Sequence, residues 1–353
     1  MPSQDIQEIR FLKNIGLLMT YQCQVQCPHC IIQAGPHRTE QMSLEDAYDW
    51  IKQIAAYRNG FIKVLSLTGG EPFINIQRLK LISDFAKERG LYVSAVTNGY
   101  WASTVEKAIN ILKSLPSLMM LQISTDKYHQ ESIPFDRVRN AMLACDACDL
   151  PFTISICTEN ENDPDYQKTL TEVSEFVDPR VIFSAITFKA GRALQLDTDH
   201  NYETSITPPI SSCGAGGAPI VFPNGQIVAC IGPIIDLKTP HPLRLGNLMQ
   251  NSIEEILDQA ESNVVLHAIR IWGPKFLINL VREAGLESEL PEKYISGSVC
   301  HACYELMANP KIVDFLMNLQ NDSDLTHKVA YARIFYLNEP EMALDLGLQL
   351  ERG

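Results

Sequence analysis

Three cysteines stand close together near the start of the chain. Cys23, Cys27 and Cys30 follow the spacing C-x3-C-x2-C in MTYQCQVQCPHC, directly after an apolar run. Thiolates hold iron–sulfur clusters, and three of them leave one iron of a four-iron cubane open to a small molecule. Half of a zinc site, helped by His29 or His37, is the alternative. Zinc normally needs a second ligand pair at a matching distance, and the sequence offers none nearby.

Two motifs together resemble the signatures of the radical S-adenosylmethionine (radical SAM) superfamily. The first is the cysteine loop with His29, an aromatic-type residue, before its last cysteine, and the second is TGGEPF at residues 68–73. The resemblance covers roughly residues 14–193. It implies a [4Fe-4S] cluster whose open iron takes the amino and carboxylate groups of S-adenosylmethionine, with His29 among the residues that contact this cofactor.

The resemblance also implies further cofactor contacts. Gly69, Gly70 and Glu71, followed by Pro72, would face the amino group, because glycine lets a backbone approach where a Cβ would obstruct. A plain strand-to-helix turn is the alternative for the two glycines. Polar residues at other predicted strand ends could meet the ribose or carboxylate, or serve as caps, turns or surface salt bridges. These are Asn98, Ser124 and Asp126, together with Arg192 in a segment that resembles one after the sixth strand of several family members.

A second set of four cysteines lies in the C-terminal part of the chain. These are Cys213, Cys230, Cys300 and Cys303. The arrangement resembles the twitch subdomain, the short form of the SPASM extension in the same superfamily, and residues 245–257 resemble the segment that follows its hairpin. The resemblance implies one auxiliary [4Fe-4S] cluster, closed by four thiolates and suited to electron relay or a structural role. A structural zinc is the alternative.

The remaining cysteines are predicted to pack rather than bind metal. Cys145 and Cys148 form another C-x2-C pair, but they share a stripe with Val138 and Met142 at helical spacing. Free cysteine is commonly buried. Cys157, on a predicted strand, is given the same interpretation.

The first half of the chain alternates short apolar runs with segments of helical period. The runs IGLLMTY, IKVLSLTG, LYVSAVTNG, LMMLQIST, FTISICT and VIFSAITF have the composition of buried parallel strands. Helical spacing lies between them, near residues 43–57, 76–89, 103–115, 135–148 and 165–177. A closed barrel needs eight such units. The sequence therefore predicts an α/β fold, a partial (β/α)6 TIM barrel with an open side.

Beyond residue 193 the pattern changes. Phe222-Pro-Asn-Gly225 marks a tight turn between two apolar runs and predicts a β-hairpin. Helical patterns follow at 252–270, 274–285, 302–319 and about 323–350. We therefore expect an N-terminal segment at 1–13, the radical SAM partial barrel at 14–200, a twitch-like subdomain at 201–310 and a helical tail at 311–353.

Composition limits the partners. The formal net charge of −13 over 353 residues disfavours nucleic acid and anionic membranes, both of which repel an acidic surface. The first residues lack the apolar run of a secretory signal, and no apolar run approaches the roughly 20 residues that span a bilayer. A cytoplasmic location is expected, where clustered thiols usually indicate metal.

The resemblance implies a reaction and its partners. A low-potential donor, flavodoxin or ferredoxin, would reduce the first cluster, which cleaves the cofactor to a 5′-deoxyadenosyl radical that abstracts hydrogen from a substrate carbon. We expect a ribosomally synthesised peptide substrate, modified by crosslinking, epimerisation or backbone excision. A small-molecule (cyclitol or sugar) dehydrogenase is the alternative, and a non-catalytic iron–sulfur scaffold is disfavoured because both motifs are intact.

Two further expectations concern the peptide reading. Lys127, Tyr128 and His129 lie at the expected barrel mouth as possible proton or hydrogen partners, although a solvated loop is the favoured alternative. Only about 14 residues precede the first strand, and the tail after Cys303 lacks strand patterns. A fused leader-recognition domain therefore has no place in the predicted layout, and a separate protein or the tail itself would recognise a leader.

Overall fold

Six parallel strands form the first half of the molecule, as predicted. The computed structural model describes residues 11–197, 201–343 and 346. The strands are β1 (Asn14–Leu18), β2 (Val64–Thr68), β3 (Tyr92–Thr97), β4 (Leu118–Ser124), β5 (Phe152–Thr158) and β6 (Ile182–Ile186). Each pairs in parallel with the next along the chain. Their carboxyl ends therefore meet at one edge, where a site can form.

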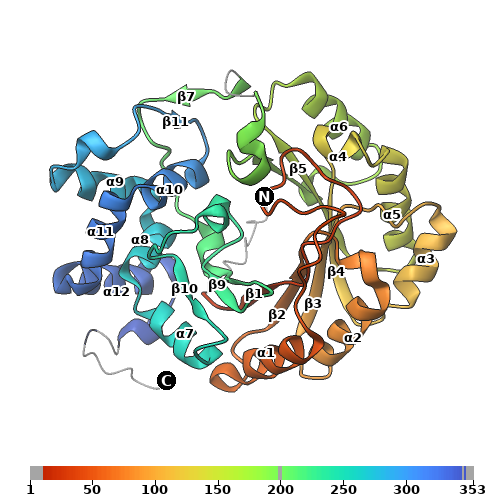
Figure 1. Cartoon of the computed structure of the whole chain (residues 1–353), viewed down its shortest axis with the longest axis horizontal. Coiled ribbons are helices and arrows are strands. Elements are labelled where there is room, and N and C mark those ends of the chain that lie inside the picture. The colour runs from red at the N-terminus through yellow and green to blue at the C-terminus, as the bar shows by residue number, and fades with distance from the viewer. Residues whose placement is uncertain (1–10, 198–200, 344–345, 347–353) are drawn as a thin grey trace, which may run out of the picture.

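Helices cover the outer side of these strands (Figure 1). They are α1 (Leu44–Ala56), α2 (Ile76–Lys87), α3 (Val105–Lys113), the short α4 (Lys127–Gln130), α5 (Phe135–Ala147) and α6 (Pro164–Ser174). Local chemistry sets their starts: the Ser43 hydroxyl, for example, accepts the Asp46 amide at the first turn of α1. The five longer helices agree with the predicted segments, and the α/β partial-barrel prediction is confirmed.

The predicted hairpin exists and extends the barrel sheet. β8 (Ile220–Val221) pairs in parallel with β1, and β9 (Gln226–Val228) and β10 (Arg244–Asn247) follow antiparallel, giving a nine-stranded mixed sheet. Gly225 closes the turn at φ +80°, a conformation that side chains with a Cβ rarely adopt. The segment that carries Cys213 and Cys230 is therefore attached to the barrel by main-chain hydrogen bonds at β1.

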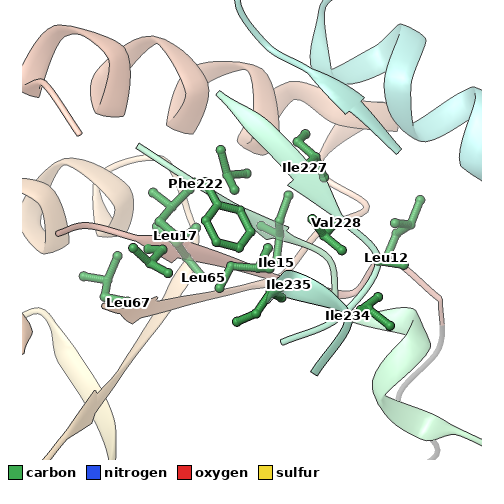
Figure 2. Packing of buried hydrophobic residues seen from close by; sticks show 14 of the residues in the cluster. Leu12, Ile15, Leu17, Leu65, Leu67, Phe222, Ile227, Val228, Ile234 and Ile235 are labelled. Carbon is green, nitrogen blue, oxygen red and sulfur yellow. The ribbon is translucent and has the colours of Figure 1, made fainter. Parts of the chain in front are cut away.

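One hydrophobic core runs through both parts. Figure 2 shows Ile15, Leu17 and Leu65 of the barrel in one cluster with Phe222 and Ile227 of the hairpin. All five are buried. Because burying such a side chain contributes about 1.5–3 kcal/mol, separating the hairpin from the barrel would expose a large apolar surface.

The C-terminal region is helical, with more breaks than predicted. It contains α7 (Ile253–Glu261), α8 (Val264–Trp272), α9 (Pro274–Glu283), α10 (Val299–Ala308), α11 (Pro310–Asn318) and α12 (Ser323–Leu337). The single helices predicted at 252–270 and 302–319 are wrong. Asn263 caps α8 through the Leu266 amide, and Pro310 starts α11 because proline has no N–H for a continuing helix.

The predicted tail helix ends early. α12 stops where Asn338 adopts φ +51°, and residues 344–345 and 347–353 lie outside the described residues. A two-stranded ladder that the sequence did not indicate joins β7 (Thr204–Ser205) to β11 (Tyr294–Ile295). The expectation for the N-terminal segment falls largely on residues 1–10, which are also outside the described part.

Helix α8 is almost entirely buried. Its Arg270 pairs with Glu339, which also accepts from Arg333 of α12, so the segment directly after α12 is held against α8 by ion pairs. Within the described ranges, no single helix is long and apolar enough to cross a bilayer. Helices α8 and α9 reach that length and composition only together, and they are bent by 117°.

Candidate functional site

The cysteine loop lies directly beyond the carboxyl end of β1. The Cys23 amide donates to the Gly35 carbonyl at 3.2 Å, which closes the loop on itself. The Asn98 amide nitrogen donates to the Cys23 sulfur, and the Ala34 backbone N–H donates to the Cys30 sulfur, both at 3.4 Å. Sulfur atoms that accept hydrogen bonds are suited to negative charge, as cluster ligands require.

The environment of these thiols favours a bound cation. Burial raises the pKa of Cys23 to about 11, and burial with neighbouring Cys23 raises the pKa of Cys27 further. Buried thiolates that repel one another are unfavourable unless positive charge lies beside them. The donor set fits an iron–sulfur cluster, which supplies that charge.

The glycines of the second motif hold the cysteine loop against β2. A Cβ on Gly69 would lie 2.4 Å from the Thr20 carbonyl oxygen, and one on Gly70 would lie 2.2 Å from that of Gln22. The Gly70 amide donates to Thr20 at 2.7 Å. Both glycines also line the cavity described below. Their close approach therefore involves the protein's own backbone, a role that the sequence reading missed.

Glu71 lies behind the cavity wall rather than in it. Its carboxylate is fully buried and accepts from the Phe73 amide at 3.0 Å, the Thr97 hydroxyl at 2.8 Å and the Asn98 amide at 2.8 Å. Burial raises its pKa to about 7. Pro72 begins a short 3-10 turn and is absent from the cavity lining. Glu71 therefore joins the ends of β2 and β3 and positions Asn98.

A cavity of about 310 Å³ opens at the carboxyl ends of the strands. This volume is at the lower end of the range typical of small-molecule sites, about 300–1,000 Å³. The structure brings most predicted residues to it. The predicted residues in its lining are Cys23, Cys27, Cys30, His29, Gly69, Gly70, Asn98, Ser124, Asp126 and His129.

Other lining residues were missed by the sequence reading. They are chiefly Gln122, Ser155, Cys157, Thr187, Phe188 and Ile231. A signal was available, because Gln122 and Ser124 on β4, like Ser155 and Cys157 on β5, are two positions apart and so share a strand face. The Thr187 hydroxyl is buried without a hydrogen-bond partner. A polar group in this state points to a ligand.

The prediction for Cys157 is wrong in part. Its side chain borders the cavity instead of packing wholly in the core, because the open barrel leaves the inner face of β5 uncovered. Cys145, in contrast, is completely buried, and Cys148 packs against the same core, as predicted.

Asp126 and His129 form a polar pair at the end of β4. Asp126 caps α4, and its Oδ2 lies 2.8 Å from Nδ1 of His129 and 3.5 Å from Nε2 of His29. Burial and His129 act on Asp126 in opposite directions, and the net effect lowers its pKa. The carboxylate therefore remains charged and orients two imidazoles beside the cavity.

Lys127 and Tyr128 point away from the cavity. The Tyr128 hydroxyl donates to Glu159 at 2.6 Å, its ring stacks on His29, and Lys127 pairs with Glu159 and Asp163, both at 2.7 Å. The solvated-loop alternative is wrong, since Tyr128 is only 5% exposed. Of the three predicted hydrogen or proton partners, only His129 reaches the cavity.

Arg192 holds the cysteine loop through two hydrogen bonds to its backbone. Its amide donates to the Cys30 carbonyl at 3.1 Å, and its guanidinium donates to the Ala34 carbonyl. A Cβ on the preceding Gly191 would lie 2.3 Å from the Ile31 carbonyl oxygen, so only glycine fits there. Arg192 does not line the cavity and acts through the loop.

The four cysteines of the second set converge from three segments. Cys213 precedes a 3-10 turn, Cys230 follows β9, and Cys300 and Cys303 lie on the first turns of α10. Burial raises the pKa of all four, and Cys303 interacts electrostatically with each of the others. The Gly232 amide donates to the Cys230 sulfur at 3.3 Å.

The sulfur atoms of neither cysteine set are grouped as tightly as those of a tetrahedral zinc site. Tetrahedral zinc, with Zn–S bonds of about 2.3 Å, brings its sulfurs within about 3.8 Å of one another. Within the described ranges, the only group of three or more His, Cys, Asp or Glu ligand atoms all within 4.8 Å is His29, Asp126 and His129. Both cysteine sets are therefore more widely spaced than a zinc site requires.

A parallel α/β sheet with a three-cysteine loop after its first strand defines a domain built for an iron–sulfur cluster with one open site. Residues 17–173 match the Radical SAM superfamily model, and this part of the chain is a radical SAM domain. It is the domain of an enzyme superfamily whose members bind a [4Fe-4S] cluster and S-adenosylmethionine.

Among curated proteins, the chain is 22% identical over 308 residues to the "Putative peptide biosynthesis protein YydG" of Bacillus subtilis, covering 86% of this chain and 94% of that protein. A shorter match, 34% identical over 91 residues, is to an S-adenosylmethionine-dependent nucleotide dehydratase of Psychrobacter lutiphocae, covering 23% of this chain and 30% of that protein.

Two solved structures are more distantly similar. One is BtrN in complex with AdoMet and 2-DOIA, with TM-score 0.45, 15% identity and coverage of 74% of this chain and 88% of that one. The other is HydG, a maturase of the [FeFe]-hydrogenase, with TM-score 0.38, 12% identity and coverage of 89% and 83%.

Proposed function

We propose that this protein cleaves S-adenosylmethionine reductively and uses the resulting radical to modify a ribosomally synthesised peptide. The observation that carries the proposal is the cavity of about 310 Å³ at the strand ends. It brings Cys23, Cys27 and Cys30 together with Gly69, Gly70 and polar groups of the neighbouring strands. One small molecule can therefore contact the cluster ligands and the barrel interior at once.

Each group in the cavity has a proposed task. Cys23, Cys27 and Cys30 hold the first cluster, which when bound supplies the electron that splits the sulfonium to a 5′-deoxyadenosyl radical. The backbone at Gly69 and Gly70 borders the space beside it, while Asn98, Ser124 and Asp126 offer hydrogen-bonding groups for the polar parts of the cofactor. His129 is held by Asp126 and can donate to the same ligand.

We assign an auxiliary [4Fe-4S] cluster to Cys213, Cys230, Cys300 and Cys303. Support comes from their convergence, their burial and their wide spacing. Ile231, next to Cys230, lines the reaction cavity. An electron could therefore pass between the second site and a substrate in the cavity, whereas four thiolates leave no iron open for direct ligation.

The peptide substrate is supported by the relative named for peptide biosynthesis, whose match extends over most of both chains. The modification we propose is crosslinking, epimerisation or backbone excision. Radical SAM enzymes need a reductant, and we propose flavodoxin or ferredoxin for it. Leader recognition by a separate protein completes the proposal.

Two measurements test the proposal. Anaerobically reconstituted protein with dithionite should form 5′-deoxyadenosine, measured by liquid chromatography, and peptides encoded beside the gene should change in intact mass on coexpression. Turnover of a free sugar or cyclitol without any peptide change would instead establish the small-molecule dehydrogenase. Absence of 5′-deoxyadenosine from cluster-loaded protein would establish the non-catalytic scaffold.

A further inference from the structure

A second cavity of about 570 Å³ adjoins the reaction cavity at Phe188 and is bordered by β6. One wall is the loop after β5, residues 158–162, with residues 184–186 of β6. The opposite wall is Glu203 together with residues 296–300, where the β7–β11 ladder leads into α10. The cavity therefore lies between the barrel edge and the C-terminal part.

The two cavities share a wall. Phe188, directly beyond β6, lines both of them. Cys300, a proposed ligand of the auxiliary cluster, lines the second cavity. A peptide bound in the second cavity could therefore extend past Phe188 and place one of its residues in the reaction cavity.

The wall formed by β6 offers unpaired backbone groups. β6 is the last strand of the nine-stranded sheet, so no strand among the described residues pairs with its outer edge. The Thr187 amide donates to the Thr158 carbonyl at 2.8 Å, so the backbone of residue 187 faces β5. Because backbone groups alternate between the two edges of a strand, those of residues 185 and 183 face β5 as well. The backbone groups of Ser184 and Ile186 therefore point to the outer edge of β6. Both residues line the second cavity. An extended peptide can pair with such an edge.

The described lining of the second cavity carries acidic side chains. Glu161 and Glu203 are exposed on opposite walls, and no lysine or arginine belongs to the described lining. Glu159 also contributes to the lining, but Lys127 neutralises it. Two exposed carboxylates that line one groove favour a cationic side chain and repel an acidic one.

We propose that the second cavity binds an extended, basic segment of the peptide substrate. The segment pairs with the outer edge of β6 and places a lysine or arginine between Glu161 and Glu203. This inference rests on the proposed peptide-modifying function and adds where the peptide lies and which residue type it carries beside the modified one.

The variant test removes both carboxylates. Glu161→Gln with Glu203→Gln should bind a fluorescein-labelled peptide of alternating threonine and lysine about tenfold more weakly in anaerobic polarisation assays, since each exposed pair contributes modestly. The matched control, Glu175→Gln with Glu283→Gln, removes two exposed carboxylates outside the cavity and should bind as the wild type does. Both variants should form 5′-deoxyadenosine without peptide at the wild-type rate.

Two altered probes test the groove from the peptide side. Glutamate in place of lysine, or N-methylation of alternate backbone amides, should abolish saturable binding. Equal binding of lysine and glutamate peptides, or unchanged affinity in the double variant, would overturn the groove. If the wild type cleaves S-adenosylmethionine and modifies peptides while the double variant does so equally well, the groove fails and the proposed function stands. If the wild type forms no 5′-deoxyadenosine, the proposed function fails.

Discussion

The two cysteine sets differ in how far apart their members lie in the sequence. The first lies on one loop between Cys23 and Cys30, whereas the second draws on positions from Cys213 to Cys303. In the first, the ligands are close in sequence, and distant residues such as Gly70 and Arg192 only hold their loop in place. In the second, the ligand set exists only after α10 has docked beside the hairpin.

This difference has a functional consequence. Three ligands on a loop leave an open coordination position beside a cavity, while the four thiolates that we propose for the second site would close it. The first site is therefore suited to reaction with a small molecule and the second to electron transfer or structure. The following predictions test that contrast, beginning with the largest effect.

Loss of the loop cysteines should abolish the chemistry. Changing Cys23, Cys27 and Cys30 together to Ala should lower iron from about eight to about four per chain and reduce 5′-deoxyadenosine to background. Iron analysis and liquid chromatography measure the two effects. Cys145→Ala with Cys148→Ser, at the packing pair, is the control and should retain all the iron. Continued cofactor cleavage by the triple variant would contradict the assignment of the first site.

Loss of the second site should separate the two activities. Changing Cys300 and Cys303 to Ala should also remove about four irons, yet leave cofactor cleavage measurable while modification of the peptide fails. The reason is that these thiols belong to the closed site, away from the three-cysteine loop. Stoichiometric zinc in the wild type, with no iron lost in the variant, would replace the auxiliary cluster by a structural zinc site.

A methyl group at Gly70 should displace the first site without touching the second. Gly70→Ala places a Cβ 2.2 Å from the Gln22 carbonyl oxygen, which forces a backbone shift. We expect unfolding to become easier by about 1–3 kcal/mol, with a parallel loss of cofactor cleavage. Gly214→Ala, beside Cys213, meets nothing within 4 Å and serves as the control. Equal thermal melting of the two variants would show that the loop tolerates the shift.

The smallest predicted effect is a dependence of stability on pH. Burial raises the pKa of Glu71 to about 7, so the folded protein holds this proton more tightly than the unfolded chain. The resulting stabilisation is complete below the ordinary glutamate pKa of about 4.3 and is lost as the pH rises to about 7. Glu71→Gln should therefore flatten the decline in melting temperature between pH 5 and pH 8. If the melting temperature of Glu71→Gln falls with pH as steeply as that of the wild type, other groups cause the decline.

The sequence predicted the barrel well because its signals are local. Each buried strand is a short apolar run, and the intervening helices have an amphipathic period and, except for α5, a side-chain cap such as Ser43. The C-terminal helices were predicted less well, since apolar spacing continued across Asn263 and Pro310. There, side-chain capping and the missing proline N–H interrupt the helices without changing the apolar pattern.

The candidate site was predicted in part for the same reason. The loop cysteines and Gly69-Gly70 form contiguous motifs, so their types and spacing carried the inference. Cys157 and Thr187 were missed because a strand residue faces either a core or a cavity according to what covers the sheet. Whether Tyr128 is exposed likewise depended on His29 and Glu159, which come from other parts of the chain.

The sequence alone determined the ligand chemistry, the parallel order of the barrel and the three-cysteine loop, because all three follow from residue type and local period. Only the tertiary structure decided that the hairpin extends the barrel sheet at β1, that Glu71 and Arg192 support the site without lining it, and that the edge of β6 faces a second cavity. These features depend on contacts between segments far apart in the chain, which local spacing does not encode.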